Sequence, residues 1–476
     1  MNAGPGRIET DSLGTVDVPA GVLWGAQTAR SLQFFAIGDQ RMPLDVIHAM
    51  AWIKWAAAVV HGELGLLSMP VAEAIAHAAL RVAGGQFDGE FPLSVWQTGS
   101  GTQSHMNVNE VIARLASQPL RAWGAASVQV DAHDDVNLGQ SSNDVFPSAM
   151  HVAVALRMKA GLLPALQQLQ VTLAAKALAF KAVAKVGRTH LQDATPLTLG
   201  QEFGGYAAQL DLCSAMLAPA LSLVHALALG GTAVGTGMNT HPEFGVRVAA
   251  LLAQRLDLPL VQANNLFAAL AGHEALVALH GALRMLAIAL TKIASDIRLM
   301  GSGPRAGLAE LRLPANEPGS SFMPGKVNPT QVEALTMVCA QVIGHDAAIG
   351  FAASQGQFEL NVYKPLIALD VLGSLRLLTD AMYSFSTHCV THLQVNETRV
   401  QGQLQDSLML ATALAPHIGH ARTAQVAVQA HAHGSTLREA ALALGAVSAE
   451  QFDSWVDVRR MLAPQVSRGP LTAAGG

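Results

Sequence analysis

The sequence predicts an all-α protein, with a long central helical bundle between smaller, mainly helical N-terminal and C-terminal domains. Three observations predict this fold class. Helix-length apolar patterns recur along the chain, short breaks rich in Gly, Pro and Ser separate them, and no alternation of strand and helix patterns appears. Because 476 residues exceed a usual single domain, we expect domains at 1–138, 139–395 and 396–476.

The first forty residues are expected to form short irregular or β segments, because turn signals recur at Gly14, Pro19 and Gly38. Pro43 then opens a helix with a broad apolar stripe. Further helices are expected at 70–84, 103–117, 147–180, 198–228, 243–256, 264–299, 329–353 and 365–390. A smaller helical region restarts near Val395, and the end, 467–476, reads as a disordered tail.

The composition is apolar for a soluble protein. Hydrophobic residues make up 51% and charged residues 13%, and the mean hydropathy is +0.32. This balance suggests surface buried between subunits as well as within them. The net charge of −5 and the absence of a basic run make nucleic acid a poor candidate partner.

The three cysteines, Cys213, Cys339 and Cys389, lie far apart and form no CxxC pair. This usage fits a reducing cytosol, and the N-terminus carries neither a signal-peptide nor a transit-peptide pattern. We therefore expect a cytoplasmic protein. Nothing in the sequence resembles the spacing of an iron–sulfur site.

One stretch imitates a membrane span, because Leu212 to Pro242 contains no Asp, Glu, Lys or Arg. It also contains Pro219, His225 and a glycine-threonine run, which a lipid-exposed helix would tolerate badly. The pattern favours a helix buried in a protein bundle.

Reactive-looking residues cluster in four polar islands, each where an irregular segment meets a helix: 98–110, 137–151, 187–202 and 319–334. Short hydroxyl and amide side chains near expected helix starts could donate hydrogen bonds to a small substrate with two carboxylates. Plain helix capping is the alternative for any single Ser or Asn among them. The clustering in a chain so poor in polar residues favours a binding site.

In the fourth island we expect Asn328 to be an N-cap, with Pro329 at the first helical position and Gln331 as the capping-box partner. Lys326 and Asn328 would then lie at a helix N-terminus, which favours an anion. Gly319 and the turn at Pro324-Gly325 would let the two serines move as a lid.

His190, in the third island, is a candidate acid–base residue, although a single histidine is often structural or merely exposed. Glu333, on the first turn of the helix after Asn328, could orient it if the fold brings them together.

These residues make the chain recognisable. GSSFMPGKVN at 319–328 resembles the GSSxMPxKxN signature of the fumarase/aspartase superfamily, and the likeness runs nearly end to end. His190 and Gly325 are similar to class II fumarases, the metal-independent type, rather than to aspartases. The resemblance implies reversible hydration of fumarate to L-malate, as in the tricarboxylic acid cycle, through an aci-carboxylate carbanion. It also implies that no metal and no cofactor is needed, and that the protein is a homotetramer whose active sites are shared between chains.

The resemblance further implies roles for individual residues. Ser320 matches the proposed base at C3, His190 the acid–base residue on the hydroxyl side, and Glu333 its support. The residues that match substrate ligands are Ser100, Gly101, Thr102, Ser141, Ser142, Asn143, Thr189, Ser321, Lys326, Val327 and Asn328.

The sequence departs from the family pattern in two places. A second anion site would fall at Asp131, Ala132, His133 and Asp134, where the family often shows His-Pro-Asn-Asp, and no arginine lies close upstream. We therefore expect that site to be weakened or lost. In the first island, His105 stands where asparagine is usual.

Three alternatives remain at this point. One is another superfamily lyase such as aspartate ammonia-lyase, and another is a non-catalytic structural oligomer. The third, a membrane protein, rests on the charge-free stretch alone.

Overall fold

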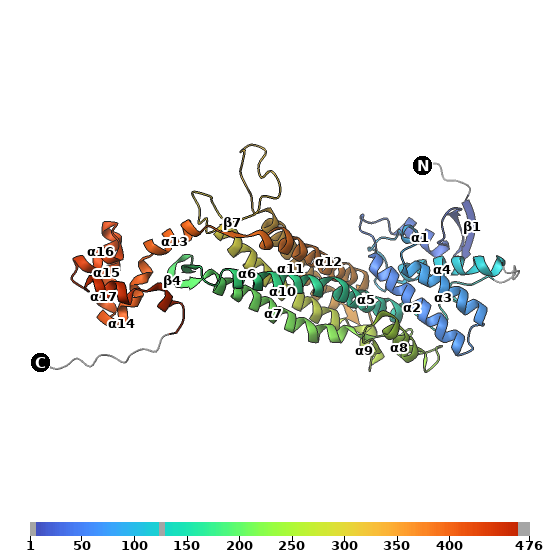
Figure 1. The fold of residues 1–476 in the computed structure, drawn as a ribbon. Helices are drawn as coiled ribbons and strands as arrows, with labels where there is room; N and C mark the ends of the chain where they lie inside the picture. Colours follow the sequence, from blue (N-terminus) through green and yellow to red (C-terminus); the bar gives the residue numbers. More distant parts are fainter. Residues whose placement is uncertain (1–5, 123–128, 465–476) are drawn as a thin grey trace. The chain divides into compact units, whose positions relative to one another are not determined.

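The computed structural model describes residues 6–122 and 129–464, so the predicted disordered tail lies outside the described residues. The described chain is mainly helical, as predicted, and its strands form five two-stranded sheets (Figure 1). It divides into two compact units. The first comprises 1–166, 213–288 and 337–380, and the second comprises 167–212, 289–336 and 381–476.

The N-terminal part of the first unit begins with a hairpin of β1 (Gly6–Asp11) and β2 (Gly14–Pro19), paired antiparallel from Gly6↔Pro19. The helices that follow are α1 (Ala26–Phe34), α2 (Leu44–Glu63), α3 (Met69–Ala83), η1 (Asp88–Glu90), α4 (Thr102–Ala122) and α5 (Ser142–Arg157). Pro43 is the N-cap of α2, and α2 packs against α3, α5 and α8 (Phe244–Leu256). Because most of α2 is buried, its apolar residues form the core of this part.

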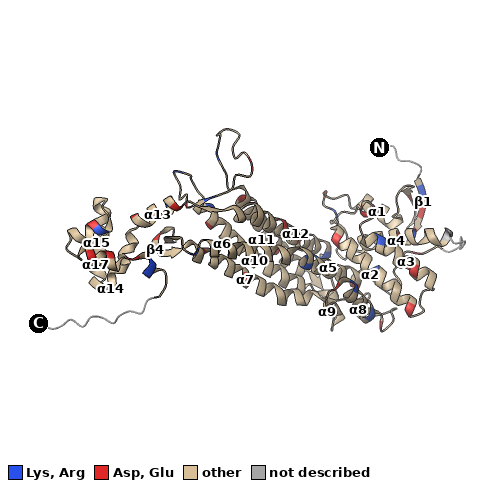
Figure 2. Ribbon diagram, in the orientation of Figure 1, with Lys and Arg blue, Asp and Glu red and all other residues tan. Residues whose placement is uncertain are grey.

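Long helices make up most of the remaining chain. They are α6 (Leu163–Ala179), which continues α5 through the π turn η2 (Met158–Leu162), α7 (Leu199–Val224), α10 (Glu274–Met300), α11 (Thr330–Ala353) and α12 (Lys364–His388). Figure 2 shows how few charged residues these helices carry. Within the described residues, four helical segments are long and apolar enough to cross a membrane by length and composition: Ser142–Ala179, Leu199–Val224, Glu274–Met300 and Thr330–Ala353.

Short strands connect the helices. They are β3 (Ala184–Thr189) with β4 (Gln192–Thr198), β5 (Ala226–Leu227) with β6 (Val261–Gln262), β7 (Leu311–Arg312) with β10 (Gln394–Val395), and β8 (Gly356–Gln357) with β9 (Leu360–Asn361). Only the β5–β6 pair is parallel among the described strands.

The C-terminal region has its own apolar cluster, which includes Leu410, Leu414, Val426, Leu437 and Phe452. Its helices are η3 (Val390–His392), α13 (Glu397–Asp406), η4 (Leu408–Leu414), α14 (Ala415–Ile418), α15 (His420–His433), α16 (Leu437–Ala443), α17 (Ala449–Trp455) and η5 (Val458–Met461). This separate core supports a small C-terminal domain. The three-part division at 138/139 and 395/396 itself stays a proposal.

The helices expected at 264–299 and 147–180 differ from the structure for a clear local reason. The helix expected at 264–299 is two helices, α9 (Leu266–Ala271) and α10, because the backbone is extended at Gly272. The helix expected at 147–180 begins earlier, at Ser142, because Ser141 and Asp144 form a complete capping box there.

Candidate active site

The first polar island lies at the start of α4. Ser100 is buried, and its Oγ lies 2.9 Å from Oγ1 of Thr102, the first residue of the helix. Gly101 has a positive φ of 76°, and a Cβ there would overlap the ring of Phe146 on α5. Glycine is therefore required for both backbone conformation and space, and it lets this loop pack directly on α5.

The second island forms the N-terminus of α5. Ser141 Oγ accepts a hydrogen bond from the Asn143 N–H at 3.2 Å, while Asp144 accepts from the Ser141 N–H at 3.0 Å. The other carboxylate oxygen of Asp144 accepts from the N–H groups of Gly230 and Thr232. Burial raises the pKa of Asp144 to about 6, although these three backbone donors oppose the rise. Asp144 thus ties the loop at 230–232 to the helix end that carries the candidate ligands.

Two buried residues lie behind this island, and the sequence indicated a role for neither of them. Lys54 on α2 donates to Asn137 Oδ1 at 2.9 Å and to Gln140 Oε1 at 3.0 Å, and burial holds the pKa of its ammonium well below the usual value. His105 on α4 lies 2.8 Å, Nδ1 to Oγ, from Ser142. The signal for Lys54 was a lone lysine in an apolar helical run, and its partners are more than 80 residues away.

The third island is the hairpin of β3 and β4. Arg188 and Lys185 form ion pairs with the buried Glu310 at 2.9 and 3.2 Å, which anchor β3. Thr189 ends the strand, and His190 follows in the turn with a positive φ of 57°. Both side chains are exposed, and in the described chain the His190 ring makes no hydrogen bond or ion pair. The hairpin therefore presents His190 to the surroundings of the chain.

The fourth island is the signature loop. Ser320 Oγ accepts hydrogen bonds from the backbone N–H groups of Phe322 and Met323 at 3.2 and 2.9 Å. The loop closes on itself, because Asn328 Nδ2 donates to the Gly319 carbonyl and a Cβ at Gly319 would overlap the Lys326 carbonyl. Ser321, Lys326 and Val327 are exposed.

The predicted capping box at this loop is wrong. The helix α11 begins at Thr330, and the Glu333 N–H donates to the Pro329 carbonyl. Gln331 Oε1 accepts from Ser384 at 2.6 Å instead of reaching back to Asn328. Gln331 is therefore bonded to Ser384, on another helix, and the Asn328 side chain closes the loop instead of capping the helix.

The candidate residues divide between the two units. The residues of the first two islands belong to the first unit, and Thr189, His190, the signature loop and Glu333 belong to the second. Within the second unit, the carboxylate of Glu333 lies 3.9 Å from Arg298. The pairing of Glu333 with His190 stays a prediction.

The segment of the expected second anion site is a compact acidic turn. Asp131 Oδ1 accepts from the N–H groups of His133 and Asp134 at 2.7 and 2.9 Å, and Asp135 accepts from the Asp131 N–H at 2.8 Å. His133 Nε2 lies 2.7 Å from the Gln27 amide. Asp131, His133 and Asp134 are exposed, and Ala132 is half-buried between them.

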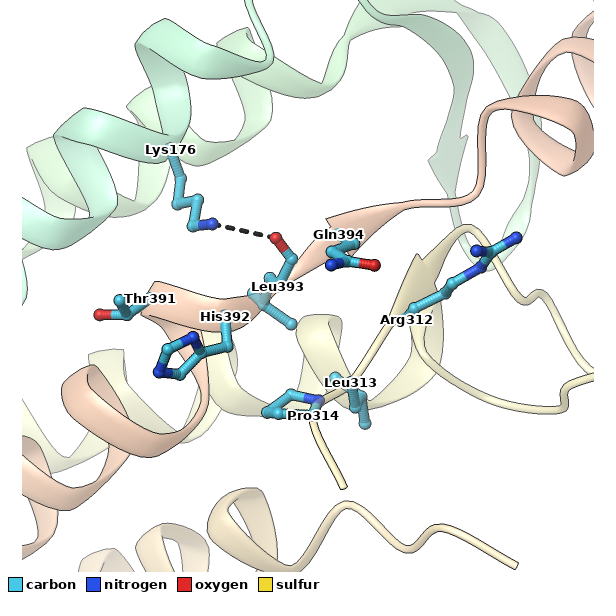
Figure 3. Close-up of a pocket in the computed structure, with 8 residues that line it drawn as sticks. All are labelled: Lys176, Arg312, Leu313, Pro314, Thr391, His392, Leu393 and Gln394. Atoms are coloured by element: carbon cyan, nitrogen blue, oxygen red, sulfur yellow. Dashed lines mark hydrogen bonds between the residues drawn. The ribbon is translucent and has the colours of Figure 1, made fainter. Parts of the chain in front are cut away.

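A separate hollow of about 520 Å³ lies in the second unit (Figure 3). Its lining includes Lys176, whose Nζ donates to the Leu393 carbonyl at 2.9 Å, together with Arg312 and His392. It contains none of the candidate residues, so we do not assign the chemistry to it. Among the described residues, no cluster of three or more His, Cys, Asp or Glu side chains is arranged to hold a metal ion.

Comparison with known proteins places this geometry in a family. The lyase family model matches residues 14–344, and the model of the fumarase C C-terminus matches residues 410–463. The class II fumarate hydratase of Chromobacterium violaceum is 59% identical over 450 residues, which cover 94% of this chain and 98% of that protein. The corresponding protein of Thermosynechococcus vestitus is 58% identical over 96% of this chain and 98% of its own.

The similarity extends to three dimensions. The crystal structure of a class II fumarase from Schistosoma mansoni superimposes with a TM-score of 0.94 at 44% identity, covering 97% of this chain and all of that one. The fold and the matched models define a lyase. The chain belongs to the class II fumarate hydratases.

This assignment confirms the predicted family, fold class and hydro-lyase activity, and it sets aside the ammonia-lyase and structural-oligomer alternatives. The chain is a soluble enzyme, so the four apolar helical segments are not membrane spans.

Proposed function

We propose that this chain interconverts fumarate and L-malate by acid–base catalysis, with the Ser320 hydroxyl as the base that removes the C3 proton of malate. The observation that carries this proposal is the pair of backbone N–H groups directed at Ser320 Oγ, from Phe322 and Met323. A serine hydroxyl is a very weak base, and fixed donors lower the free energy of the alkoxide that it must become. Lys326, which follows Ser320 by six residues in the same loop, adds positive charge.

Removal of the proton leaves a carbanion whose charge spreads into the adjacent carboxylate, giving an aci-carboxylate. Fixed donors must stabilise that charge. Lys326 and Asn328 supply a cation and an amide from the signature loop. The short side chains at the starts of α4 and α5 supply hydroxyl and amide donors where the helix dipoles favour an anion.

His190 acts on the hydroxyl side, through a water molecule, and Thr189 binds the substrate beside it. The exposed position of both residues on the β3–β4 turn supports a site completed by another subunit. Glu333 would then support a histidine from a partner chain. In the single chain its charged neighbour, Arg298, is itself exposed and forms only a weak pair at 3.9 Å.

A homotetramer with shared sites explains the apolar surface of the single chain. Large apolar side chains are exposed along the long helices, including Leu212 on α7, Ile288 on α10, and Met337 and Phe351 on α11. Only 22% of the most apolar window of α11 is buried inside the single chain. Water contact over so much apolar surface is unfavourable, which supports burial against further copies. We place the enzyme in the cytoplasm, where its buried free cysteines would stay reduced.

The direct test follows fumarate absorbance with purified enzyme supplied with malate, aspartate and argininosuccinate in turn, before and after exhaustive chelation in air. We expect fumarate from malate alone, at an unchanged rate after chelation, because charge stabilisation relies on protein donors. Loss of activity on chelation that iron restores would contradict the metal-independent mechanism. Release of ammonia from aspartate would contradict the substrate assignment.

A further inference from the structure

His105 lies behind the second island, fully buried on α4 one turn after Thr102. Its Nδ1 is 2.8 Å from the hydroxyl of Ser142, the first residue of α5. Its Nε2 is also buried and has no hydrogen-bond partner among the described residues. Ser142 itself is half-buried, so the residue is not sealed inside the protein. This one contact joins a residue that departs from the family pattern to a candidate substrate ligand.

The imidazole of His105 is neutral. Burial, reinforced by the nearby Lys54 ammonium and by His133, holds the pKa of His105 well below its usual value. The Lys54 ammonium is itself fixed by Asn137 and Gln140. A neutral imidazole has one N–H donor and one bare nitrogen, so the remaining choice is which nitrogen carries the proton.

The two tautomers have different consequences for Ser142. With the proton on Nε2, a buried donor would be left without an acceptor, and the Ser142 hydroxyl would have to donate its only proton to Nδ1. With the proton on Nδ1, the ring donates to Ser142 Oγ, and the unpaired atom is a bare acceptor, which buried sites tolerate more often than an orphaned N–H. A carboxylate can only accept hydrogen bonds, so a serine that binds it must donate.

We propose that His105 is a positioning residue for the substrate carboxylate: it donates from Nδ1 to Ser142 Oγ and thereby reserves the Ser142 proton for the substrate. The inference deepens the proposed function and rests on Ser142 being a substrate ligand. It also makes the site selective, because a hydroxyl oriented in this way favours an ionised carboxylate over a group that must donate.

Two substitutions of His105 by amide side chains distinguish the roles of its two ring nitrogens. In His105→Asn, the amide nitrogen can occupy the place of Nδ1, whereas in His105→Gln it reaches only toward the place of Nε2. We expect His105→Gln to raise KM for fumarate about tenfold to a hundredfold with a smaller change in kcat, as loss of a hydrogen bond to a charged group does. We expect His105→Asn to recover most of that loss.

Ser142→Ala should raise KM by a similar factor alone and cause little further rise in His105→Gln, because both changes remove the same interaction. Independent, multiplicative effects on KM would overturn the coupling. An unchanged KM in Ser142→Ala, in an enzyme that still hydrates fumarate, would overturn the role of Ser142 and this inference with it. Wild-type turnover of fumarate tests the proposed function separately.

Neutron diffraction of the wild-type enzyme keeps the inference testable even if the variants fold poorly. A deuterium atom on Nδ1 of His105, directed at Ser142 Oγ, supports the proposal. A deuterium atom on Nε2, or on both nitrogens, overturns it.

Discussion

At the scale of one residue, the hydrogen bonds around Ser320 support the role of base that we propose for it. Its oxygen accepts hydrogen bonds from two backbone N–H groups of the same loop, and both donors are uncharged. Backbone donors need no side-chain ordering at the moment of reaction, so their stabilisation of an alkoxide is available in advance. The loop can hold them because its ends are joined by Asn328 and the close packing of Gly319.

Substitution of Ser320 by alanine removes the proposed base. We expect kcat to fall by about two to four orders of magnitude, as loss of a general acid or base typically does, with a smaller effect on KM. The measurement is steady-state conversion of malate, with Ser354→Ala as the control, because that exposed serine bonds only to its near neighbours Phe351 and Gln355. A Ser320→Ala enzyme with near-normal kcat would end the serine-base hypothesis.

At the scale of elements, helix starts and one hairpin present the candidate residues. The N-terminal turns of α4 and α5 present the short donors, with Gly101 packed on Phe146 and Asp144 tied to the loop at 230–232. Glu310 anchors strand β3 through Lys185 and Arg188, while the turn that carries His190 is exposed. Anchored strands with exposed turns are typical of segments that meet a ligand or a partner chain.

The acidic turn at 131–134 is the element for which we expect lost binding. Asp131 and Asp134 place carboxylates where a dicarboxylate would approach, and like charges repel. A crystal soaked in malate should therefore show no occupied ligand between these residues. The double variant Asp131→Asn/Asp134→Asn removes the repulsion and serves as the comparison. A well-occupied malate between the two aspartates of the wild-type enzyme would contradict the prediction.

At the scale of the whole molecule, buried histidines and the half-buried His151 make stability depend on pH. Burial lowers the pKa of His61 and His151 to about 4, against an ordinary value of 6.5. Their contribution to the free energy of unfolding is therefore present above pH 6.5 and is lost as the pH falls toward 4. At pH 5 each of these histidines would lower the free energy of unfolding by about 2 kcal/mol relative to pH 7. Burial raises the pKa values of Asp144 and Asp370 to about 6. Each of these carboxyls therefore raises the free energy of unfolding at pH 5 by about 1 kcal/mol relative to pH 7, which partly offsets the histidines.

His105 and His273 are also buried with lowered pKa values, so the histidines outweigh the two aspartates. We expect the thermal midpoint Tm to fall between pH 7 and pH 5 at constant ionic strength. His61→Phe should lessen the fall, because it removes one titrating group and retains the stack on Phe244, now 4.7 Å between ring centroids. Equal Tm values at the two pH values would refute the expectation.

The proposed shared site can be tested by subunit exchange. His190→Asn and Ser320→Ala enzymes should each be nearly inactive, and mixing them by denaturation and reassembly should restore activity. If copies assort randomly, about one site in four receives both intact residues from different chains of a symmetric assembly. No recovery, with mixed tetramers confirmed by native mass spectrometry, would place both residues on one chain and overturn the architecture.

By itself, the sequence determined the fold class, most of the helices and the family, because periodic apolar residues and the run at 319–328 are local properties of the chain. It also indicated the residue types of the candidate site. It did not reveal that α9 and α10 are separate, or that Gln331 bonds to Ser384 rather than capping its own helix. In both places the local sequence pattern did not predict the structure that forms.

Only the tertiary structure decided which distant residues meet. Lys54 contacts Asn137 and Gln140, and His105 contacts Ser142, across 37 to 86 residues of sequence. No local pattern encodes such pairs, because they depend on how separate helices pack. Their chemistry also depends on burial, which shifts the pKa values of Lys54 and His105 downward by removing water from the charged forms. The sequence names the groups, and packing determines their charge and their hydrogen-bond partners.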